Sequence, residues 1–342
     1  MKVFEIRDAF GLDHLVAAER PRPVAGPGQV VLRMKAASLN YRDLLMVTGR
    51  YDPRIPLPLI PCSDGVGEIV EIGPGVESRK VGERVATLFC QRWPAGEPTR
   101  EGLRSTLGGP LDGTLAEFVA LPESGVIPVP EHLTDTEAAT LPCAALTAWS
   151  ALVTWGGVRA GQTVLLQGTG GVSIFALQMA QLLGARAIVT SSSDSKLETA
   201  RRLGAWQTIN YRRDENWGKT ARGMTGGSGV DLVVEVGGAG TLAQSCRAVR
   251  PGGRISLIGV LSGHSSDLDI LPIVMQNLRV QGILVGARDG FEAMNRAIAQ
   301  HELEPLIDRV FPFDECREAL AYLGGGLHVG KVCIAIAADA AY

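Results

Sequence analysis

Three glycines in one short stretch of the chain are spaced to bind a phosphate group. Residues 164–185 divide into an apolar strand, a turn that contains Gly168, Gly170 and Gly171, and an amphipathic helix. Because glycine lacks a Cβ atom, another molecule can approach such a turn closely, and the unpaired N–H groups at the helix start attract an anion. The turn departs from the usual dinucleotide fingerprint at its last glycine, which is Ser173 here. We therefore expect this turn to hold the pyrophosphate of a dinucleotide.

The next strand ends in residues that bear on the choice of nicotinamide cofactor. NAD-selective domains usually have an acid at this point, which accepts a hydrogen bond from the adenosine ribose. This chain instead has a lysine, Lys196, shortly after three hydroxyl side chains, Ser191, Ser192 and Ser193. Small hydroxyls and a cation leave room and charge for a 2′-phosphate, so the sequence predicts NADPH, or NADP+ as its oxidised form.

Asp194 is the evidence against NADPH, because its carboxylate could accept a hydrogen bond from the ribose itself. We interpret it as a helix-start residue beside a capping pattern formed by Ser195 and Glu198. Selection of NADH by Asp194 is the alternative, and the sequence leaves it open.

A regular alternation of strands and helices must position these residues. Apolar runs typical of buried strands recur at residues 187–190, 207–211, 231–236, 254–259 and 280–284. Helical patterns lie between them, near residues 195–203, 214–224, 242–249 and 269–278. This alternation predicts an α/β fold, a Rossmann domain with a doubly wound parallel sheet and helices on both faces. Glycine turns mark the expected helix ends at Gly184, Gly204 and Pro251-Gly252-Gly253.

The first 125 residues have a different pattern. They are rich in Pro and Gly and contain short strand-like segments, which predicts a compact β-rich, barrel-like unit. The C-terminal tail adds two helical and two strand patterns and is expected to pack on that unit. We therefore expect two domains: residues 1–124 and 288–342 form one, and residues 125–287 form the cofactor domain inserted between them.

Composition excludes several classes of function. A net charge of −3, from 33 basic and 36 acidic residues, provides no basic field for nucleic acid. No apolar run approaches the roughly 20 residues of a membrane span, and the N-terminus lacks a signal-peptide pattern, so we expect a cytoplasmic protein. Reduced thiols rather than a disulfide framework are expected for the six scattered cysteines, Cys62, Cys90, Cys143, Cys246, Cys316 and Cys333.

Nearly the whole chain resembles the medium-chain dehydrogenase/reductase superfamily. The matching stretches are AASLNYRDLLMVTGRY, PCSDGVGEIVEIGPGV, VGERV, the glycine turn and GAWQTINYR. The closest resemblance is to the zinc-independent, quinone-oxidoreductase-like branch, which includes zinc-type alcohol dehydrogenase-like proteins and reduces quinones or activated carbonyl compounds with NADPH. The resemblance implies a GroES-like catalytic domain, an active site in the cleft between domains, and a homodimer or homotetramer.

The zinc ligands of the alcohol-dehydrogenase branch are missing from this chain. That branch uses a Cys and a His-Glu pair, whereas this sequence has residues 39–43 (LNYRD) and then Ser63 and Asp64 at those places. Catalytic zinc generally needs three protein ligands. In the region of the structural zinc lobe, Cys90 stands alone. We therefore expect no metal, and we expect Asp43 and Asp64 to be buried hydrogen-bonding or salt-bridging residues.

Without a metal, the protein must position the hydride acceptor and stabilise charge on its oxygen. Conjugation spreads that charge in quinones and α,β-unsaturated carbonyl compounds, so these substrates suit such a site. The resemblance places three candidate catalytic residues at the nicotinamide, Asn40, Tyr41 and Arg42. Packing at the domain interface is the alternative role of Tyr41 and Arg42. An apolar substrate pocket is expected from the loop 91–113 with Leu44, Met46, Tyr51 and Trp93.

The resemblance also implies contacts to the cofactor beyond the glycine turn. Lys196 and Tyr211 match residues that bind the 2′-phosphate in this branch. Tyr211 could otherwise be only an aromatic residue at a strand end. The remaining predicted cofactor contacts are Thr147, Val172, Gly237, Gly259 and Lys331.

Two other functions stay open. One is an alcohol dehydrogenase acting on secondary alcohols or ketones, which zinc ligands would have indicated. The other is a nucleotide-binding sensor or structural protein without turnover, which a test for NADPH oxidation would separate from an enzyme.

Overall fold

The computed structural model describes residues 1–265 and 267–336, which form two compact units. The first unit is Met1–Leu146 together with the chain from Gly286 onward, and the second is Thr147–Val285. The sequence set the first boundary at residue 124. In the structure β7 (Val126–Pro128) pairs with β5 (Arg84–Thr87), and α3 (Asp135–Ala138) packs on the same sheet. The first unit therefore extends beyond the predicted boundary.

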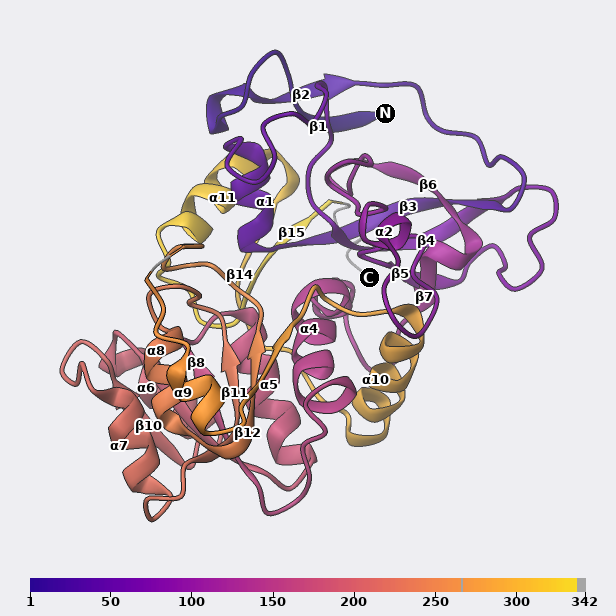
Figure 1. Ribbon diagram of the computed structural model, residues 1–342. Helices are drawn as coiled ribbons and strands as arrows, with labels where there is room; N and C mark the ends of the chain where they lie inside the picture. The colour runs from indigo at the N-terminus through magenta and orange to yellow at the C-terminus, as the bar shows by residue number, and fades with distance from the viewer. Residues whose placement is uncertain (266, 337–342) are drawn as a thin grey trace. The chain divides into compact units, whose positions relative to one another are not determined.

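A mixed sheet organises the first unit (Figure 1). Its strand order is β14-β15-β3-β4-β5-β7, and β6 also pairs with β3. These strands are β3 (Gln29–Leu39), β4 (Asp64–Ile72), β6 (Phe118–Pro122), β14 (Ile307–Pro312) and β15 (Lys331–Ala335). A separate two-stranded sheet is formed by β1 (Lys2–Ile6) and β2 (Leu15–Glu19). Because β15 lies antiparallel to β3, the tail packs on the N-terminal unit, as expected.

Short helices connect these strands, and longer ones belong to the tail. The short elements are η1 (Leu12–His14), α1 (Tyr41–Val47), α2 (Arg100–Leu103), η2 (Glu123–Gly125) and the π-helical segment η3 (Leu141–Ala145). The tail contributes α10 (Arg288–His301), η5 (Phe313–Glu315) and α11 (Cys316–Gly324).

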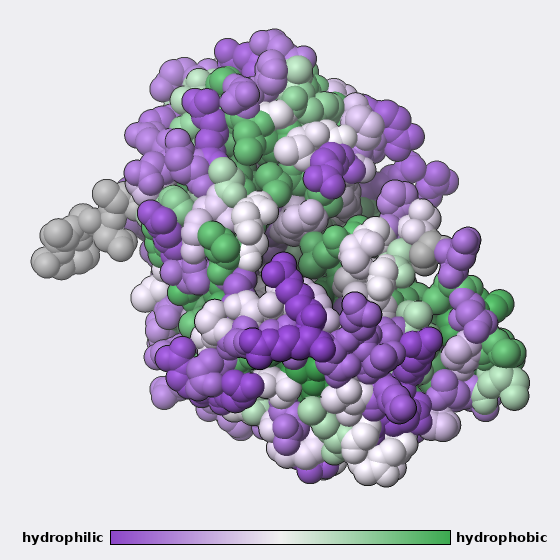
Figure 2. Space-filling model, turned by 90° about the vertical axis from the view of Figure 1, so that its left-hand side faces the viewer, coloured by the Kyte–Doolittle hydropathy of each residue, from purple (hydrophilic) through white to green (hydrophobic). Residues whose placement is uncertain are grey.

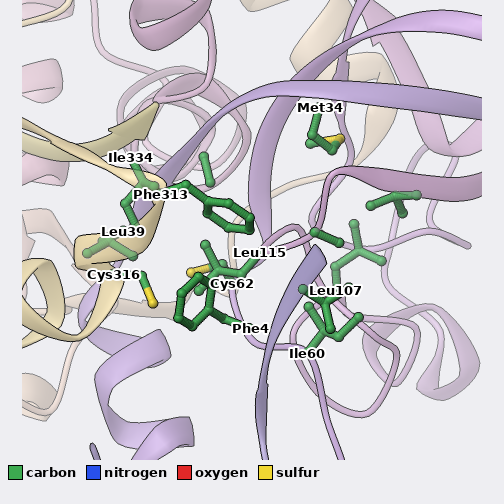
Figure 3. Packing of buried hydrophobic residues seen from close by; sticks show 14 of the residues in the cluster. Phe4, Met34, Leu39, Ile60, Cys62, Leu107, Leu115, Phe313, Cys316 and Ile334 are labelled. Carbon is green, nitrogen blue, oxygen red and sulfur yellow. The ribbon is translucent and has the colours of Figure 1, made fainter. Parts of the chain in front are cut away.

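Aromatic and aliphatic side chains from both ends of the chain build the core of the first unit. Figure 3 shows Phe4 of β1 beside Phe313 of the tail, and their rings meet edge to face with centroids 5.0 Å apart. Burying one such ring contributes about 1.5–3 kcal/mol. Cys62 and Cys316 lie in the same core (Figure 3), and all six cysteines are free thiols.

Six parallel strands form the sheet of the second unit, in the order β10-β9-β8-β11-β12-β13. This order is that of a Rossmann domain, which confirms the predicted fold. The strands are β8 (Thr163–Gln167), β9 (Arg186–Ser191), β10 (Gln207–Asn210), β11 (Val230–Glu235), β12 (Val249–Leu257) and β13 (Arg279–Gly282). The helices packed around them (Figure 1) are α5 (Gly171–Leu182), α6 (Asp194–Arg202), α7 (Trp217–Met224), α8 (Leu242–Ala248) and α9 (Leu271–Met275). The unit begins at Thr147, within α4 (Leu146–Trp149), and continues with the π-helical segment η4 (Ser150–Thr154).

One predicted turn lies inside a strand. The sequence placed Pro251-Gly252-Gly253 at a helix end, but α8 ends at Ala248 and β12 begins at Val249. The partner register of β11 shifts here, from Val249 to Arg254, so the glycines form an irregularity within β12. Among the described residues, no helix combines the length and apolarity needed to cross a membrane.

Candidate active and cofactor sites

The glycine turn of the second unit leaves open space where a ligand would approach. Gly168 has φ +74°, a conformation that L-residues with side chains rarely adopt. A Cβ atom added to Gly168 or Gly170 would meet nothing within 4 Å. Gly170 is the N-cap of α5, and no side chain caps this helix start. The geometry therefore fits an anion such as a pyrophosphate at the positive end of α5.

Ser173 replaces the last glycine of the fingerprint without closing the turn. Its hydroxyl is buried and donates to the carbonyl oxygen of Gln167 at 2.5 Å. The Ser173 side chain therefore points back toward β8, and its hydrogen bond links the first turn of α5 to the end of that strand.

The end of β9 brings together the residues predicted to select the cofactor. Ser191 is buried and lies beside Asn210 of β10, and the Tyr211 N–H donates to the Ser191 carbonyl oxygen at 3.1 Å. The Tyr211 side chain is 42% exposed. Lys196 is half-buried in the first turn of α6. These positions make a partly open polar region at the carboxyl ends of β9 and β10.

The helix α6 starts earlier than the sequence predicted. Its N-cap is Ser193 and its first residue is Asp194, so the capping pattern assigned to Ser195 and Glu198 is wrong. Ser195 instead contacts Ser193 through their hydroxyl oxygens, 2.8 Å apart. Glu198 forms an ion pair with Arg201 at 2.9 Å.

The Asp194 carboxylate already has two partners. It accepts a hydrogen bond from Asn210 Nδ2 at 2.7 Å and pairs with Arg213 at 2.5 Å. These contacts hold both carboxylate oxygens on the protein, although the side chain stays about half exposed.

Other predicted cofactor contacts lie in tightly packed surroundings. A Cβ atom at Gly237 would lie 2.3 Å from Thr241 Oγ1, and one at Gly259 would lie 2.1 Å from the Val236 carbonyl oxygen. Both glycines are therefore required by the protein's own packing. Thr147 is buried in α4, and Val172 is half-buried at the start of α5.

In the first unit, a capping box presents the candidate catalytic segment. The Asn40 N–H donates to Asp43 Oδ2 at 2.7 Å, and the Asn40 side chain accepts from the Asp43 backbone N–H. This pairing starts α1 directly after β3 and sets Tyr41 and Arg42 in its first turn. Tyr41 is 38% exposed.

Arg42 binds the protein's own loop. Its guanidinium donates to the carbonyl oxygens of Leu107 and Gly109 and to Thr106 Oγ1 at 3.1 Å. It also lies over the ring of Phe89, 5.0 Å from the ring centroid. These contacts favour the structural alternative for Arg42, which holds loop 106–109 against α1.

Lys331, predicted to contact the cofactor, is buried beside this helix start. Its ammonium donates to the Leu39 carbonyl oxygen at 2.7 Å and to Asn40 Oδ1 at 2.6 Å. Lys331 therefore orients the Asn40 amide. Asn40 Nδ2 lies close enough to Asp64 to lower the pKa of that carboxyl, but it makes no hydrogen bond within the described residues.

Two buried acids flank this lysine, as the sequence anticipated. Asp64 accepts hydrogen bonds from Ser63 Oγ at 2.7 Å and from the Cys143 N–H at 3.1 Å. Burial raises the pKa of Asp64, and the Lys331 ammonium opposes this effect. Burial also raises the pKa of Asp43 to about 6; Arg42 lowers it and Asp64 raises it further. Asp43 Oδ1 has no hydrogen-bond partner among the described residues.

These residues do not fit a zinc site. Across residues 1–265 and 267–336, no group of three or more His, Cys, Asp or Glu side chains is placed to hold a metal ion. Cys143 lies beside Asp64, and its backbone N–H donates to the Asp64 carboxylate at 3.1 Å.

Loop 91–113 carries a basic hollow. Its volume is about 490 Å³, and its lining residues are Arg92, Arg100, Glu101, Arg104, Ser105 and Leu111. Arg92 pairs with Glu101 at 2.8 Å. Met46 and Trp93, two of the expected pocket residues, are buried in the first unit.

Sequence comparison places the chain among dehydrogenases. Residues 26–131 match the family model described as "Alcohol dehydrogenase GroES-like domain", and residues 171–300 match "Zinc-binding dehydrogenase". A zinc-type alcohol dehydrogenase-like protein of Schizosaccharomyces pombe is 42% identical, with 95% of this chain and 96% of that protein covered. An acryloyl-coenzyme A reductase of Sulfurisphaera tokodaii is 28% identical, with 92% and 95% covered.

Solved structures agree with this placement over 98–99% of the chain. An NAD-dependent alcohol dehydrogenase has a TM-score of 0.91 at 34% identity, with all of that chain covered. A crotonyl-CoA carboxylase/reductase in complex with NADP has a TM-score of 0.88 at 26% identity, with 95% covered. A mycobacterial quinone oxidoreductase has a TM-score of 0.81 at 26% identity, with all of it covered.

Proposed function

The chain belongs to the medium-chain dehydrogenase/reductase superfamily of NAD(P)-dependent oxidoreductases, and on that premise we propose that it reduces quinones or α,β-unsaturated carbonyl compounds with NADPH and without catalytic zinc. The observation that carries the proposal is Lys331. Beside the two segments in which the sequence lacks the zinc ligands of the alcohol-dehydrogenase branch, this chain puts a buried ammonium against Asn40 and near Asp64.

Several residues of the second unit would hold the cofactor. The backbone of Gly168, Gly170 and Gly171 and the start of α5 suit the pyrophosphate. The hydroxyls at 191–193 with Lys196 and Tyr211 suit a 2′-phosphate. NADPH is supported further by Asp194, because its two protein partners occupy the carboxylate that would otherwise bind the ribose.

When bound, NADPH supplies a hydride to an electrophilic carbon. The chain must then place a donor near the substrate oxygen, where negative charge develops. Tyr41 suits this role because it stands exposed in the first turn of a helix, and Lys331 and Asp43 fix the preceding Asn40. Arg42 supports the same segment from loop 106–109.

The test is turnover of the purified protein. Oxidation of NADPH should match the amount of quinone or enone added, whereas a secondary alcohol with NADP+ should react far more slowly. Tyr41→Phe should lower kcat by about tenfold or more. Tyr322→Phe, a matched loss of a hydroxyl from a tyrosine of α11 that binds Asp308, should not. Binding of NADPH without turnover of any of these substrates would favour the non-catalytic alternative.

The basic hollow favours a second candidate substrate class, the enoyl thioesters of coenzyme A. Arg100 and Arg104 lie one helical turn apart at this hollow, and like charges at that spacing repel unless an anion lies between them. The phosphates of coenzyme A are such anions, and two of the neighbours act on coenzyme A thioesters by name. Arg100→Glu with Arg104→Glu should raise KM for crotonyl-CoA but not for a small enone. Arg317→Glu is the control, because Arg317 is an exposed arginine of α11 and does not line the hollow.

A homodimer, or a tetramer of such dimers, is proposed from the apolar surface of the second unit. Strand β13 is the edge of the parallel sheet and exposes all four of its residues. Nearby exposed apolar side chains are Ile270, Leu271, Val274 and Met275, each at least 59% accessible. Figure 2 shows apolar surface, in green, gathered at the right-hand edge of the face drawn. The double variant Val274→Glu with Met275→Glu should be a monomer in light scattering.

We also propose that the protein resides in the cytoplasm.

A further inference from the structure

Two polar side chains end adjacent strands where the parallel sheet of the second unit reverses its order. Gln167 is the last residue of β8 and Glu235 the last of β11, and these strands are neighbours. In open parallel sheets, ligands bind beyond the carboxyl ends of the strands at this switch point. Both side chains therefore lie where the proposed function expects the dinucleotide.

The Glu235 side chain anchors the loop that follows β11. Its Oε1 accepts from the N–H groups of Gly237 and Gly238 at 2.9 and 3.0 Å and from Thr241 Oγ1 at 2.6 Å. The carboxylate is completely buried. An ionised carboxylate can only accept hydrogen bonds. The loop is therefore held in the arrangement that points these three donors at the Glu235 carboxylate.

Gln167 joins this carboxylate to the glycine turn. Its Nε2 donates to Glu235 Oε2 at 2.6 Å, and Ser245 Oγ donates to the same oxygen. Its Oε1 accepts from the Gly237 N–H at 3.1 Å, and its carbonyl accepts from Ser173 Oγ of α5. The network therefore links the loop after β11 to both the strand and the helix that flank the turn.

The described hydrogen-bond donors to the Glu235 carboxylate are all uncharged groups. In the described part of the chain, the hydrogen-bond partners of the Glu235 carboxylate are two backbone amides, two hydroxyls and one carboxamide, and none is a cation. Hydrogen bonds to an ionised group are roughly twice as strong as neutral ones, and a buried donor left unpaired is costly. Exchange of the acid for an amide would therefore force the loop to move.

We propose that Glu235 is a positioning residue for the dinucleotide, which fixes the loop at 237–238 relative to the glycine turn. The inference rests on the proposed function, in which that turn binds the cofactor. Glu235 acts on the shape of the binding region as a whole and not on the 2′-phosphate. It should therefore affect NADPH and NADH alike.

The test begins with Glu235→Gln, which keeps the shape and removes the charge. The NH2 group of the new glutamine would face the Gln167 and Ser245 donors. KM for NADPH and for NADH should therefore each rise about tenfold or more. The kcat at saturating cofactor should stay within about twofold of the parent's. Simple loss of folded protein would lower kcat and leave KM unchanged. Asp231→Asn is the matched control, because it makes the same exchange at the opposite end of β11, where Asp231 binds Arg250.

A reciprocal exchange provides the rescue. In Gln167→Glu with Glu235→Gln, the amide and the acid trade places, so each donor can again face an acceptor once Ser245 reverses its hydroxyl. The double variant should recover most of the lost cofactor affinity. If Glu235→Gln does not fold, Thr241→Val, which removes a single donor, should raise both KM values by a smaller factor.

The outcomes separate the two ideas. A parent protein that binds neither NADPH nor NADH in titration calorimetry would overturn the proposed function. A parent that binds them, with a Glu235→Gln variant whose KM values match the parent's, would overturn the role of Glu235. A double variant no better than Glu235→Gln would also overturn it.

Discussion

The buried carboxyl of Asp43 should make the stability of the protein depend on pH in an unusual direction. Burial raises its pKa from 3.8 to about 6. A group whose folded pKa is raised stabilises the protein fully below its unfolded pKa, and that stabilisation is lost as pH rises through the folded value. The difference between 3.8 and about 6 corresponds to about 3 kcal/mol.

Asp43→Asn isolates this contribution. The amide has the shape of the protonated carboxyl, and its oxygen can still accept from the Asn40 N–H, so the capping box can form. Near pH 4 the variant and the parent should have similar free energies of unfolding. By pH 7 the variant should be the more stable of the two, by about 3 kcal/mol, because the parent must hold a buried negative charge.

The assay is urea unfolding of both proteins at several pH values between 4 and 7.5, followed by circular dichroism. Taking the difference in free energy of unfolding between variant and parent cancels the contributions of all other groups. One such group is Glu5: burial raises its pKa, but Arg7 and Arg20 lower it by more. A difference that stays constant within about 0.5 kcal/mol across this range would show that Asp43 is not a strained buried acid.

Five further results are expected. Gly170→Val should keep the melting temperature of the cofactor-free protein, because its Cβ meets nothing within 4 Å, but calorimetry should show lost NADPH binding. Lys196→Ala should weaken NADPH by about one or two powers of ten and leave NADH nearly unchanged in the same titration, since each charge-assisted bond is worth roughly 1.5–3 kcal/mol. Ser191→Asp should likewise weaken NADPH relative to NADH. If instead the parent prefers NADH and Asp194→Ala removes that preference, Asp194 is the specificity residue. Elemental analysis should find far less than one zinc per chain and a chelator should leave turnover unchanged. Lys331→Met should destabilise the protein by about 3 kcal/mol in urea, because the Asn40 amide and Asp64 lose a buried cation.

The Rossmann strands could be predicted from the sequence because buried parallel strands are continuous apolar runs. Helix α1 could not, because its seven residues are too few for a periodic pattern, and its signal was the Asn40 and Asp43 capping pair. The long-range contacts that hold the candidate active segment in place also could not be predicted, although Arg42 and Lys331 were both named as candidate site residues. Arg42 reaches Leu107, and Lys331 reaches Asn40 across 291 positions of sequence. Contacts at such separations depend on which strands pair.

Glu235 was missed for a related reason. An acid that ends an apolar strand looks like the start of a surface loop, and only the neighbouring strand supplies the Gln167 amide that binds it. The signal that could have found it was the pair of polar residues, Gln167 and Glu235, each ending a run of buried apolar residues. The strand order of the sheet was needed to bring them together.

The pairing of β15 with β3 sets the order in which the protein can become active during synthesis. The ribosome makes β3 early, then the whole second unit, and only afterwards β15 with Lys331. Until β15 emerges, residues 36–39 of β3 lack a partner on one edge, and Asn40 lacks the ammonium that orients it. The second unit, in contrast, is contiguous in sequence and can fold while the first is incomplete. A nascent chain should therefore gain its nucleotide-binding fold before the candidate active segment is assembled.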